Sequence, residues 1–469
     1  MDALWHIIRW IVVSFLLIGT LAGGAYYWFR ITYSPTVPKL KFPSPQTAAE
    51  AQRQDLEYFR NYLRYDRAYA PPARVEAERL LSTYETQAGK LSPVQFELAI
   101  SRMVALADNG HSAVRISARR HNRIPCRFYR FGDGIFVLRA RPQCRKLLGA
   151  RVTAIDGRSI DNVLHAMYEF VRGPRNHYEQ LRSVFFLESP ELLHAAGLVV
   201  RSDRLTLVMA LPDGSAYEQT LSADPPDSDG PRVYSDSYLS PQRLAGEAND
   251  WASLLDTRAE LPFFLQDYAV PFRSAYWPAK STYYIQFKGN NDQGGYKIGD
   301  FVKRVKREIA ANKPRVIVLD MRFNQGGNFV KTARFMSSLA HLTDSIKRLY
   351  IFTSAWTFSA GEVSVALAKQ HGADKAVIVG EPVGDRMRFW AEGGAMCLPN
   401  SQICMSFATG LHDYIKGCEG EPRCFVMLRV FPVKVTTLAP DVPVAYEFAD
   451  YVKRRDPLLD RVMVLNSQP

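Results

Sequence analysis

Metal-binding cysteine patterns are absent from this chain of 469 residues, which has only six cysteines. None of the six shows C-x-x-C spacing or a neighbouring histidine of the kind that suits zinc. Nothing in the sequence implies a bound metal or an organic cofactor, so we expect neither. An internal repeat is also lacking, which argues against a repeat protein.

A concentrated basic patch is missing as well, although the chain is basic. Its formal net charge is +12, from 59 Lys and Arg against 47 Asp and Glu. The basic residues are scattered, with no aromatic-interleaved stripe and no nucleic-acid motif. We therefore expect no nucleic-acid partner. A surface that tolerates anionic lipid head groups explains the charge equally well.

A long uncharged run stands at the N-terminus, within residues 1–30. Residues 10–29 carry no charge, and about 20 apolar residues suffice to span a bilayer as a helix. Aromatic residues flank the run at Trp10 and at 26–28, as at a membrane interface. This pattern favours an uncleaved anchor, while the small residues at 22–25 leave a cleaved signal peptide as the alternative. Either way, the remainder is expected outside the cytoplasm.

The six cysteines fall into three local pairs. We expect each pair to close a short surface loop by a disulfide, which suits an oxidising compartment. The expected pairs are Cys126–Cys144, Cys397–Cys404 and Cys418–Cys424.

The chain changes character several times, and 47% hydrophobic with 23% charged residues is an ordinary globular balance. Its length predicts two or three domains. Residues 31–46 are proline-rich, as a linker is, and residues 47–125 have helical apolar spacing. Residues 126–225 alternate as strands do, and residues 226–280 predict a linking segment. In residues 281–469, buried strands such as VIVLD and AVIVGEP alternate with helices, which predicts an α/β domain with an at least partly parallel sheet.

Two strand ends in this last region carry residues suited to acyl transfer. After VIVLD comes NQGG, which exposes backbone N–H groups and has no Cβ at Gly326 or Gly327. After IFTSAW comes TFSAGE, in which Ser359 opens a helix as a nucleophile or as a plain N-cap. A nucleophilic serine needs two N–H donors for the developing oxyanion, and Gly327 and Ala360 could supply them. The glycines could also be simple turn residues.

Several motifs in one order resemble the tail-specific, or C-terminal-processing, serine peptidases, a superfamily that includes the tricorn-type proteases. The motifs are ALADNGHSAVR, LLGARVTAIDGRSI, VIVLDMRFNQGGN, TFSAGE, VIVGEPVGDR, CLPNSQ, TTLAPDVPV and DPLLDRVM. The resemblance covers most of residues 95–465. It implies an α/β fold with a crotonase-like (ClpP-type) protease domain in 281–469 and a PDZ-like module in 126–225. The N-terminal helical subdomain and the membrane anchor complete the expected architecture.

By this resemblance Ser359 matches the family nucleophile, and Gly327 and Ala360 match the oxyanion donors. The general base departs from the family pattern. Tail-specific members have a lysine downstream of the serine, in a G-K-G context, where this chain reads GDR at residues 384–386. Arginine, with a pKa above about 12, cannot deprotonate serine near neutral pH. The Ser–Lys dyad is therefore absent.

A histidine base remains open to this chain, because histidine is the usual general base near neutral pH. Tricorn-like members take a histidine from the upstream segment, and His111 in ADNGHSAVR matches it, with Ser112 beside it. These members orient the histidine with a carboxylate beyond the nucleophile. Glu419 matches that carboxylate, with Asp413 as the alternative. His111 could instead be an ordinary surface-loop residue.

Other polar and aromatic residues near these motifs have mainly structural interpretations. Asp320 and Glu381 are expected to be structural, and Glu362 either completes an S-x-x-E capping box or orients the site. Phe389 and Trp390 could line a substrate cleft.

These features predict a membrane-anchored serine peptidase that hydrolyses polypeptides with a Ser–His pair. The resemblance implies a bacterial envelope protein, anchored in the inner membrane and facing the periplasm, or secreted after signal cleavage. A different class of function stays open because the family lysine is missing. The chain could be an inactive peptidase fold that binds peptides or partner proteins, for example by strand addition. Substrate and oligomeric state are left undetermined.

Overall fold

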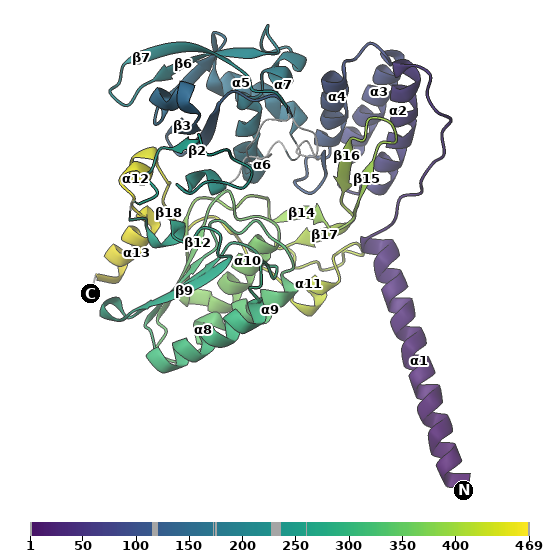
Figure 1. The fold of residues 1–469 in the computed structure, drawn as a ribbon. Helices are drawn as coiled ribbons and strands as arrows, with labels where there is room; N and C mark the ends of the chain where they lie inside the picture. Colours follow the sequence, from purple (N-terminus) through teal and green to yellow (C-terminus); the bar gives the residue numbers. More distant parts are fainter. Residues whose placement is uncertain are drawn as a thin grey trace.

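The computed structural model describes residues 2–114, 121–171, 173, 176–226, 236–258 and 260–467 (Figure 1). A single long helix, α1 (Asp2–Tyr33), projects away from a body of three parts. Its segment Arg9–Tyr33 is long and apolar enough to cross a membrane, by length and composition. The anchor was predicted to end at residue 30, but the helix continues to Tyr33.

The first part of the body is a helical subdomain. Proline and capping residues set its helices: Pro93 opens the third, and Ser92 forms a capping box there with Gln95. Its apolar faces pack into one core, which also receives side chains from a distant hairpin. The helices are α2 (Ala48–Tyr65), α3 (Pro71–Thr86) and α4 (Pro93–Ala105). The strands packed beside them are β1 (Ala113–Val114), β15 (Gly394–Cys397) and β16 (Cys404–Phe407).

The second part is a mostly antiparallel module in strand order β2-β3-β4-β6-β7. Its strands are β2 (Cys126–Phe131), β3 (Gly134–Ala140), β4 (Arg151–Ile155), β5 (Arg158–Ser159), β6 (Arg204–Ala210), β7 (Ala216–Ser222) and β8 (Ala252–Ser253). Its helices are α5 (Ile160–Met167), α6 (His177–Arg182), α7 (Pro190–Ala195) and the 3-10 helix η4 (Ser183–Glu188). Strand β2 lies at the edge of this sheet.

The third part is an α/β domain around a six-stranded sheet in the order β18-β13-β12-β11-β10-β9. Strands β10 to β13 and β18 run parallel, and β9 pairs antiparallel with β10, so the predicted partly parallel sheet is confirmed. The strands are β9 (Phe272–Trp277), β10 (Thr282–Phe287), β11 (Val316–Asp320), β12 (Arg348–Thr353), β13 (Ala376–Gly380) and β18 (Val442–Pro443).

Helices α8, α9 and α10 cover one face of this sheet, which positions α10 behind the end of β12 (Figure 1). Helix α8 buries Ile298, Phe301, Val305 and Ile309, the three- and four-residue spacing of an amphipathic helix. The helices are α8 (Ile298–Asn312), α9 (Val330–Ser338), α10 (Ala360–Gly372), α11 (Met427–Val430), α12 (Phe448–Val452) and α13 (Pro457–Ser467). A further hairpin pairs β14 (Arg388–Ala391) with β17 (Gly410–Asp413).

The expected disulfides form in two of three cases. Cys397–Cys404 and Cys418–Cys424 are bridged. The third expectation is wrong in this structure: Cys126 and Cys144 are free thiols, both buried in the core of the strand module. Burial raises the pKa of the Cys126 thiol well above its usual range. These two residues are therefore part of the core and do not close a surface loop.

Candidate active site

Ser359 stands at the sharp turn between β12 and α10. Its backbone has φ 55° and ψ −124°, in the left-handed half of conformational space that non-glycine residues avoid at a cost of about 1–3 kcal/mol. Ser359 occupies the N-cap position, yet its side chain makes no capping hydrogen bond. The plain N-cap interpretation is therefore wrong for the hydroxyl, which points elsewhere.

The hydroxyl of Ser359 meets the imidazole of His111. Ser359 Oγ and His111 Nε2 are 3.0 Å apart, although 248 positions separate the two residues in the chain. The imidazole lies between two phenyl rings, stacked on Phe358 at 4.7 Å and on Phe389 at 5.3 Å. The flat contacts on both faces restrict how the ring can turn.

Hydrogen bonds join the loop that carries His111 to strands β14 and β16. Trp390 N donates to Asn109 Oδ1 at 3.0 Å, and Ser406 Oγ donates to the carbonyl oxygen of His111 at 3.0 Å. Asn109 Nδ2 in turn donates to Ser112 Oγ at 3.0 Å. The buried Ser112 thus supports the loop itself, and its hydroxyl is used in this hydrogen bond.

A glycine-rich loop after β11 passes directly beside Ser359. Gly326 and Gly327 have φ of 105° and 127°, and a Cβ at Gly326 would lie 2.8 Å from Ser359 Cβ and 3.2 Å from Ala360 N. Asn290 N donates to the carbonyl of Gly326 at 2.8 Å, which fixes the loop from behind. Only glycine allows this approach.

Two backbone N–H groups near the hydroxyl are available to a ligand. Among the residues that the structure describes, neither Gly327 N nor Ala360 N has a hydrogen-bond acceptor. Ala360 N belongs to the first turn of α10, where helices leave N–H groups unsatisfied and the helix dipole favours negative charge. The arrangement can hold a developing oxyanion.

Neither carboxylate expected to orient the histidine reaches it. Glu419 lies on the surface with its side chain 81% exposed, and its carboxylate is 3.5 Å from Lys434 Nζ. Asp413 is buried but accepts from Arg388 Nε at 3.1 Å and from backbone N–H groups of its own turn. The expected place of Glu419 beside His111 is therefore wrong, because the loop closed by Cys418–Cys424 turns that side chain to solvent.

Two buried carboxylates, Glu362 and Asp385, lie behind the nucleophile instead. Asp385 N donates to Glu362 Oε1 at 2.5 Å, so Glu362 does not complete a capping box. Burial, and then the neighbouring Asp385 charge, raise the pKa of Glu362 well above its usual range. Burial raises the pKa of Asp385 to about 6. A Cβ on Gly110 would lie 3.0 Å from Asp385 Oδ2, so the Asp385 carboxyl packs against the loop that carries His111.

The turn at residues 384–386 also reaches that loop. Arg386 Nη1 donates to Asp108 Oδ2 at 2.8 Å, and its Nη2 donates to the carbonyl of Asp108. Arg386 thus bridges the turn after β13 to the residue three positions before His111. Arg386 therefore supports the loop that carries His111.

Asp320 is confirmed as a structural residue. It is fully buried, and its carboxylate accepts from Arg322 N and Nε at 3.0 Å and from the Tyr284 hydroxyl. Arg322 also forms a bidentate ion pair with Asp456 at 2.9 Å. This network joins the end of β11 to the C-terminal helix α13.

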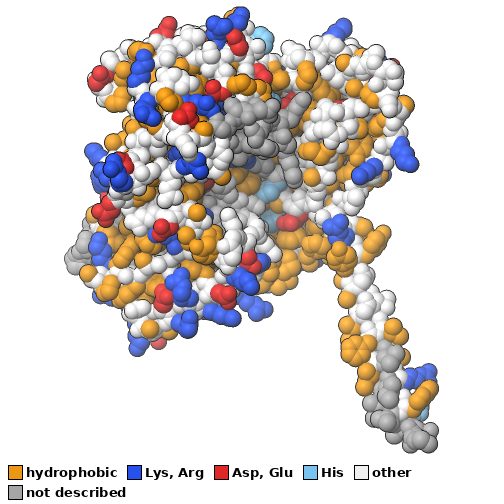
Figure 2. Space-filling view, viewed as in Figure 1, with side chains coloured by type: hydrophobic (Ala, Val, Ile, Leu, Met, Phe, Trp, Pro, Cys, Tyr) orange, Lys and Arg blue, Asp and Glu red, His pale blue; other side chains and the backbone are white. Residues whose placement is uncertain are grey.

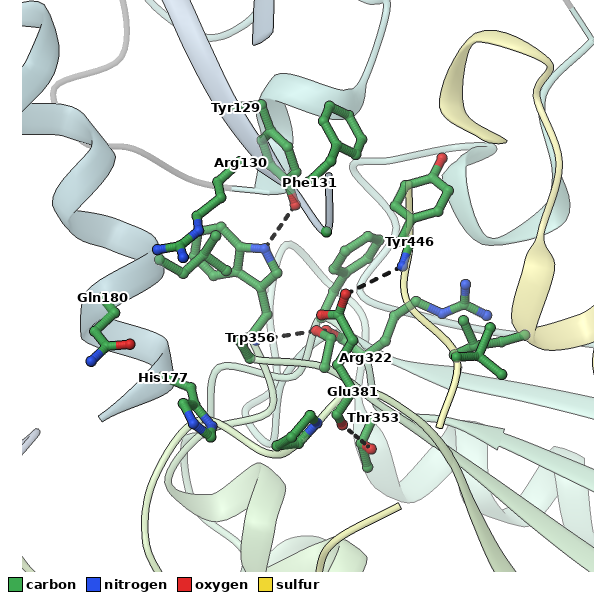
Figure 3. Close-up of a pocket in the computed structure, with 18 residues that line it drawn as sticks. Tyr129, Arg130, Phe131, His177, Gln180, Arg322, Thr353, Trp356, Glu381 and Tyr446 are labelled. Atoms are coloured by element: carbon green, nitrogen blue, oxygen red, sulfur yellow. Dashed lines mark hydrogen bonds between the residues drawn. The ribbon is translucent and has the colours of Figure 1, made fainter. Parts of the chain in front are cut away.

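A cavity of about 290 Å³ lies beside the same strand ends, lined by residues of β2, α6 and the C-terminal segment (Figure 3). Ser359 and His111 do not line it. Within it, Trp356 Nε1 donates to the Tyr129 hydroxyl at 2.9 Å, and Tyr446 N donates to Glu381 Oε1 at 3.2 Å. Glu381 therefore links the end of β13 to the C-terminal segment, which is the structural role expected of it.

Of the predicted cleft residues, Phe389 contacts His111 directly, while the backbone of Trp390 holds Asn109. Among the described residues, no cluster of His, Cys, Asp or Glu could hold a metal ion. The reactive groups brought together are thus an alcohol, an imidazole and two backbone amides.

No family model and no curated protein sequence matches the chain. Solved structures do match. Mature CPAF in complex with lactacystin aligns with a TM-score of 0.56 at 14% identity, over 90% of this chain and 99% of that one. A point mutant of CPAF aligns with a TM-score of 0.58 at 13% identity, over 90% and 98%. The photosystem II D1 C-terminal processing protease aligns with a TM-score of 0.37 at 13% identity, over 84% and 93%. These neighbours belong to the tail-specific (S41) protease superfamily.

Proposed function

We propose that this chain, whose fold is that of the tail-specific protease superfamily, is a membrane-anchored serine peptidase. Ser359 is its nucleophile, His111 its general base, and Gly327 N and Ala360 N its oxyanion donors. The observation that carries the proposal is the 3.0 Å separation of His111 Nε2 and Ser359 Oγ beside two unused N–H groups. A crotonase-like protease domain and a PDZ-like module describe the third and second parts of the body.

The reaction follows from this geometry. Ser359 Oγ attacks the carbonyl carbon of the scissile peptide bond, and its proton passes to His111 Nε2. The carbonyl oxygen becomes an oxyanion between Gly327 N and Ala360 N. The C–N bond breaks as His111 gives the proton to the leaving amine, and an ester remains on Ser359. Water, deprotonated by His111, hydrolyses the ester and restores the alcohol.

Aromatic packing contributes to the orientation of the base. Phe358 and Phe389 hold the two faces of the His111 ring, and Tyr178 stacks on Phe358 at 4.2 Å from the side of the strand module. Tyr178 N also donates to the carbonyl of Gly384. The strand module therefore contributes to the site by supporting the aromatic stack.

The second candidate function is peptide binding without catalysis, by addition of a strand to the β2 edge. Backbone N–H groups at this edge already have partners within the protein. Phe128 N donates to Glu188 Oε1, and Ile124 N donates to the carbonyl of Glu188, both at 2.8 Å. Glu188 is fully buried and also accepts from Arg123 Nε at 3.0 Å. A partner strand would have to displace this buried carboxylate, so the peptidase is favoured.

Hydrolysis of a casein-derived peptide mixture by the full-length protein tests the proposal. Ser359→Ala is expected to abolish hydrolysis, and His111→Gln to lower it by about 10²–10⁴-fold. Ser82→Ala and His165→Gln, both at exposed positions, serve as matched controls and should leave it unchanged. Undiminished hydrolysis by Ser359→Ala would exclude the nucleophile. Peptide capture by an inactive wild type would favour the binding function.

A further inference from the structure

The outer end of the membrane-spanning helix is built into the catalytic body. Tyr33, the last residue of α1, is only 2% exposed, and its hydroxyl donates to the carbonyl of Cys424 at 2.5 Å. The carbonyl of Tyr33 accepts from Gly393 N at 2.6 Å and from Thr409 Oγ1 at 3.1 Å. The segment 31–46, expected as a linker, is therefore fixed to the body at Tyr33, and we call this contact the joint.

Aromatic packing strengthens this joint. Phe425 contacts the rings of Phe29 and Tyr33, with centroids 6.2 Å and 5.3 Å apart. Phe425 follows the disulfide-closed loop 418–424 and precedes α11. Because Phe29 and Tyr33 lie on the last turns of α1, the chain around Phe425 is at the level where the helix leaves the bilayer. Figure 1 shows α11 beside this end of α1.

The surface beside this joint combines exposed apolar and basic side chains. Ile415 and Val430 are 54% and 58% exposed. Lys416, Arg423 and Arg429 are exposed in the same stretch of chain, and the charges of Arg423 and Arg429 act on Tyr33. We call these five residues the collar. Figure 2 shows hydrophobic side chains continuing from the upper end of α1 onto the adjoining lower face of the body.

The collar adds positive charge to this surface. Among the described residues, no carboxylate lies within ion-pair distance of Lys416, Arg423 or Arg429. The two acidic residues of this stretch are used elsewhere: Glu419 is paired with Lys434, and Glu421 with Arg388. Exposed aliphatic residues among unpaired basic ones are the pattern of surfaces that lie on anionic bilayers.

We propose that the collar rests on the bilayer, with Ile415 and Val430 in the interface and Lys416, Arg423 and Arg429 on anionic lipid head groups. This inference rests on the proposed anchoring by α1. The docked helix places the collar at the interface, where basic residues are attracted to anionic lipid head groups. The peptidase body is thereby held in one orientation on the membrane.

The site lies close to this contact. His412 stacks on Phe425 at 5.6 Å and on Phe389 at 4.9 Å, and Phe389 is one of the two rings that hold His111. The candidate catalytic histidine is therefore joined to the anchored end of the protein through a continuous stack of side chains.

The test uses the full chain in lipid nanodiscs, with a fluorophore on one introduced cysteine and nitroxide-bearing lipids as quenchers. The labelled variants are Val430→Cys and Ile415→Cys in the collar, Leu17→Cys within α1, and Val200→Cys on an exposed turn of the strand module. We expect quenching at Leu17, Val430 and Ile415 and none at Val200. Quenching at the two collar positions should be stronger when phosphatidylglycerol is added to phosphatidylcholine, and Arg423→Glu with Arg429→Glu should remove that increase.

The outcomes separate this inference from the proposal on which it rests. Quenching at Leu17 without quenching at Val430 and Ile415 would overturn the collar and leave the anchor intact. No quenching at Leu17 would overturn the anchor and the collar together. Equal quenching at Val430 in the two lipid compositions would overturn the role of the basic residues.

Discussion

Arg386 forms two hydrogen bonds to Asp108, three residues before His111. Its Nη1 donates to Asp108 Oδ2 at 2.8 Å, and its Nη2 donates to the carbonyl of Asp108. Asp108 has a positive φ of 45°, so the loop bends sharply at this contact. The turn at residues 384–386 thus supports the loop that carries His111. Arg386 is a positioning residue in this account, because it acts on Ser359 only through His111.

Arg386→Ala is expected to lower kcat by roughly ten- to a hundredfold with little change in KM, because small displacements of a catalytic group have effects of this size. Steady-state peptide hydrolysis gives both constants. Arg386→Lys, which keeps the charge, should recover part of the lost kcat. An unchanged kcat in the alanine variant would contradict the positioning role.

A methyl group on the glycine-rich loop should disable the site. In Gly326→Ala the new Cβ would fall 2.8 Å from Ser359 Cβ, at a φ of 105° that disfavours any side chain. We expect loss of hydrolysis and of labelling by a fluorophosphonate. Gly295→Ala is the matched control, because Gly295 has a φ of 85° and nothing within 4 Å of a Cβ. It shares the backbone strain without the clash, and loss of labelling in both variants would refute this assignment of the loop.

Thiol counting tests the cysteine arrangement. Denatured, unreduced protein should react at two thiols, Cys126 and Cys144, and reduced protein at six, since the other four cysteines form two disulfides. Peptide mapping of the alkylated positions identifies them. No reactive thiol before reduction would mean that Cys126 and Cys144 are bridged as well.

Stability should fall as the pH rises through the titration of His121. This ring lies 3.0 Å from Glu191 and 3.3 Å from Glu97 and is nearly buried. Burial alone lowers its pKa, but the bonds to Glu191 and Glu97 outweigh that effect and raise the pKa to about 9. A raised pKa in the folded state stabilises the protein below about pH 6.5, and this contribution is lost up to about pH 9.

Urea unfolding at pH 6 and at pH 9 measures this contribution, which should be at most about 3 kcal/mol. The His121→Gln variant, which cannot gain the proton, should lose that part of the pH dependence. An unchanged pH dependence in the variant would show that His121 is not the group responsible.

Ser359 and the glycine-rich loop were predictable because both follow buried strands, and parallel strands bring their carboxyl ends to one edge of a sheet. His111 came from the family resemblance alone, since no local pattern shows that a loop before β1 will fold onto α10. The positive φ of Ser359 has no sequence signature either, although it distinguishes the residue from a simple N-cap.

The failures have physical causes that a sequence does not carry. The direction of Glu419 depends on how a disulfide-closed loop turns, and the spacing from Ser359 says nothing about that. Cys126 and Cys144 have the spacing of a loop disulfide, but both fall on the buried side of the strand module. The burial of Tyr33 could not be predicted, because the prolines that follow it are typical of a free linker.

The most direct test of the central claim is the rate at which a fluorophosphonate modifies the full-length protein, followed by intact-protein mass spectrometry with peptide mapping. The account predicts a single adduct on Ser359, formed at least a hundredfold more slowly in His111→Gln, in line with the ~10²–10⁴ contribution of a general base. An adduct on another residue, or equal rates in the wild type and the His111→Gln variant, would contradict it.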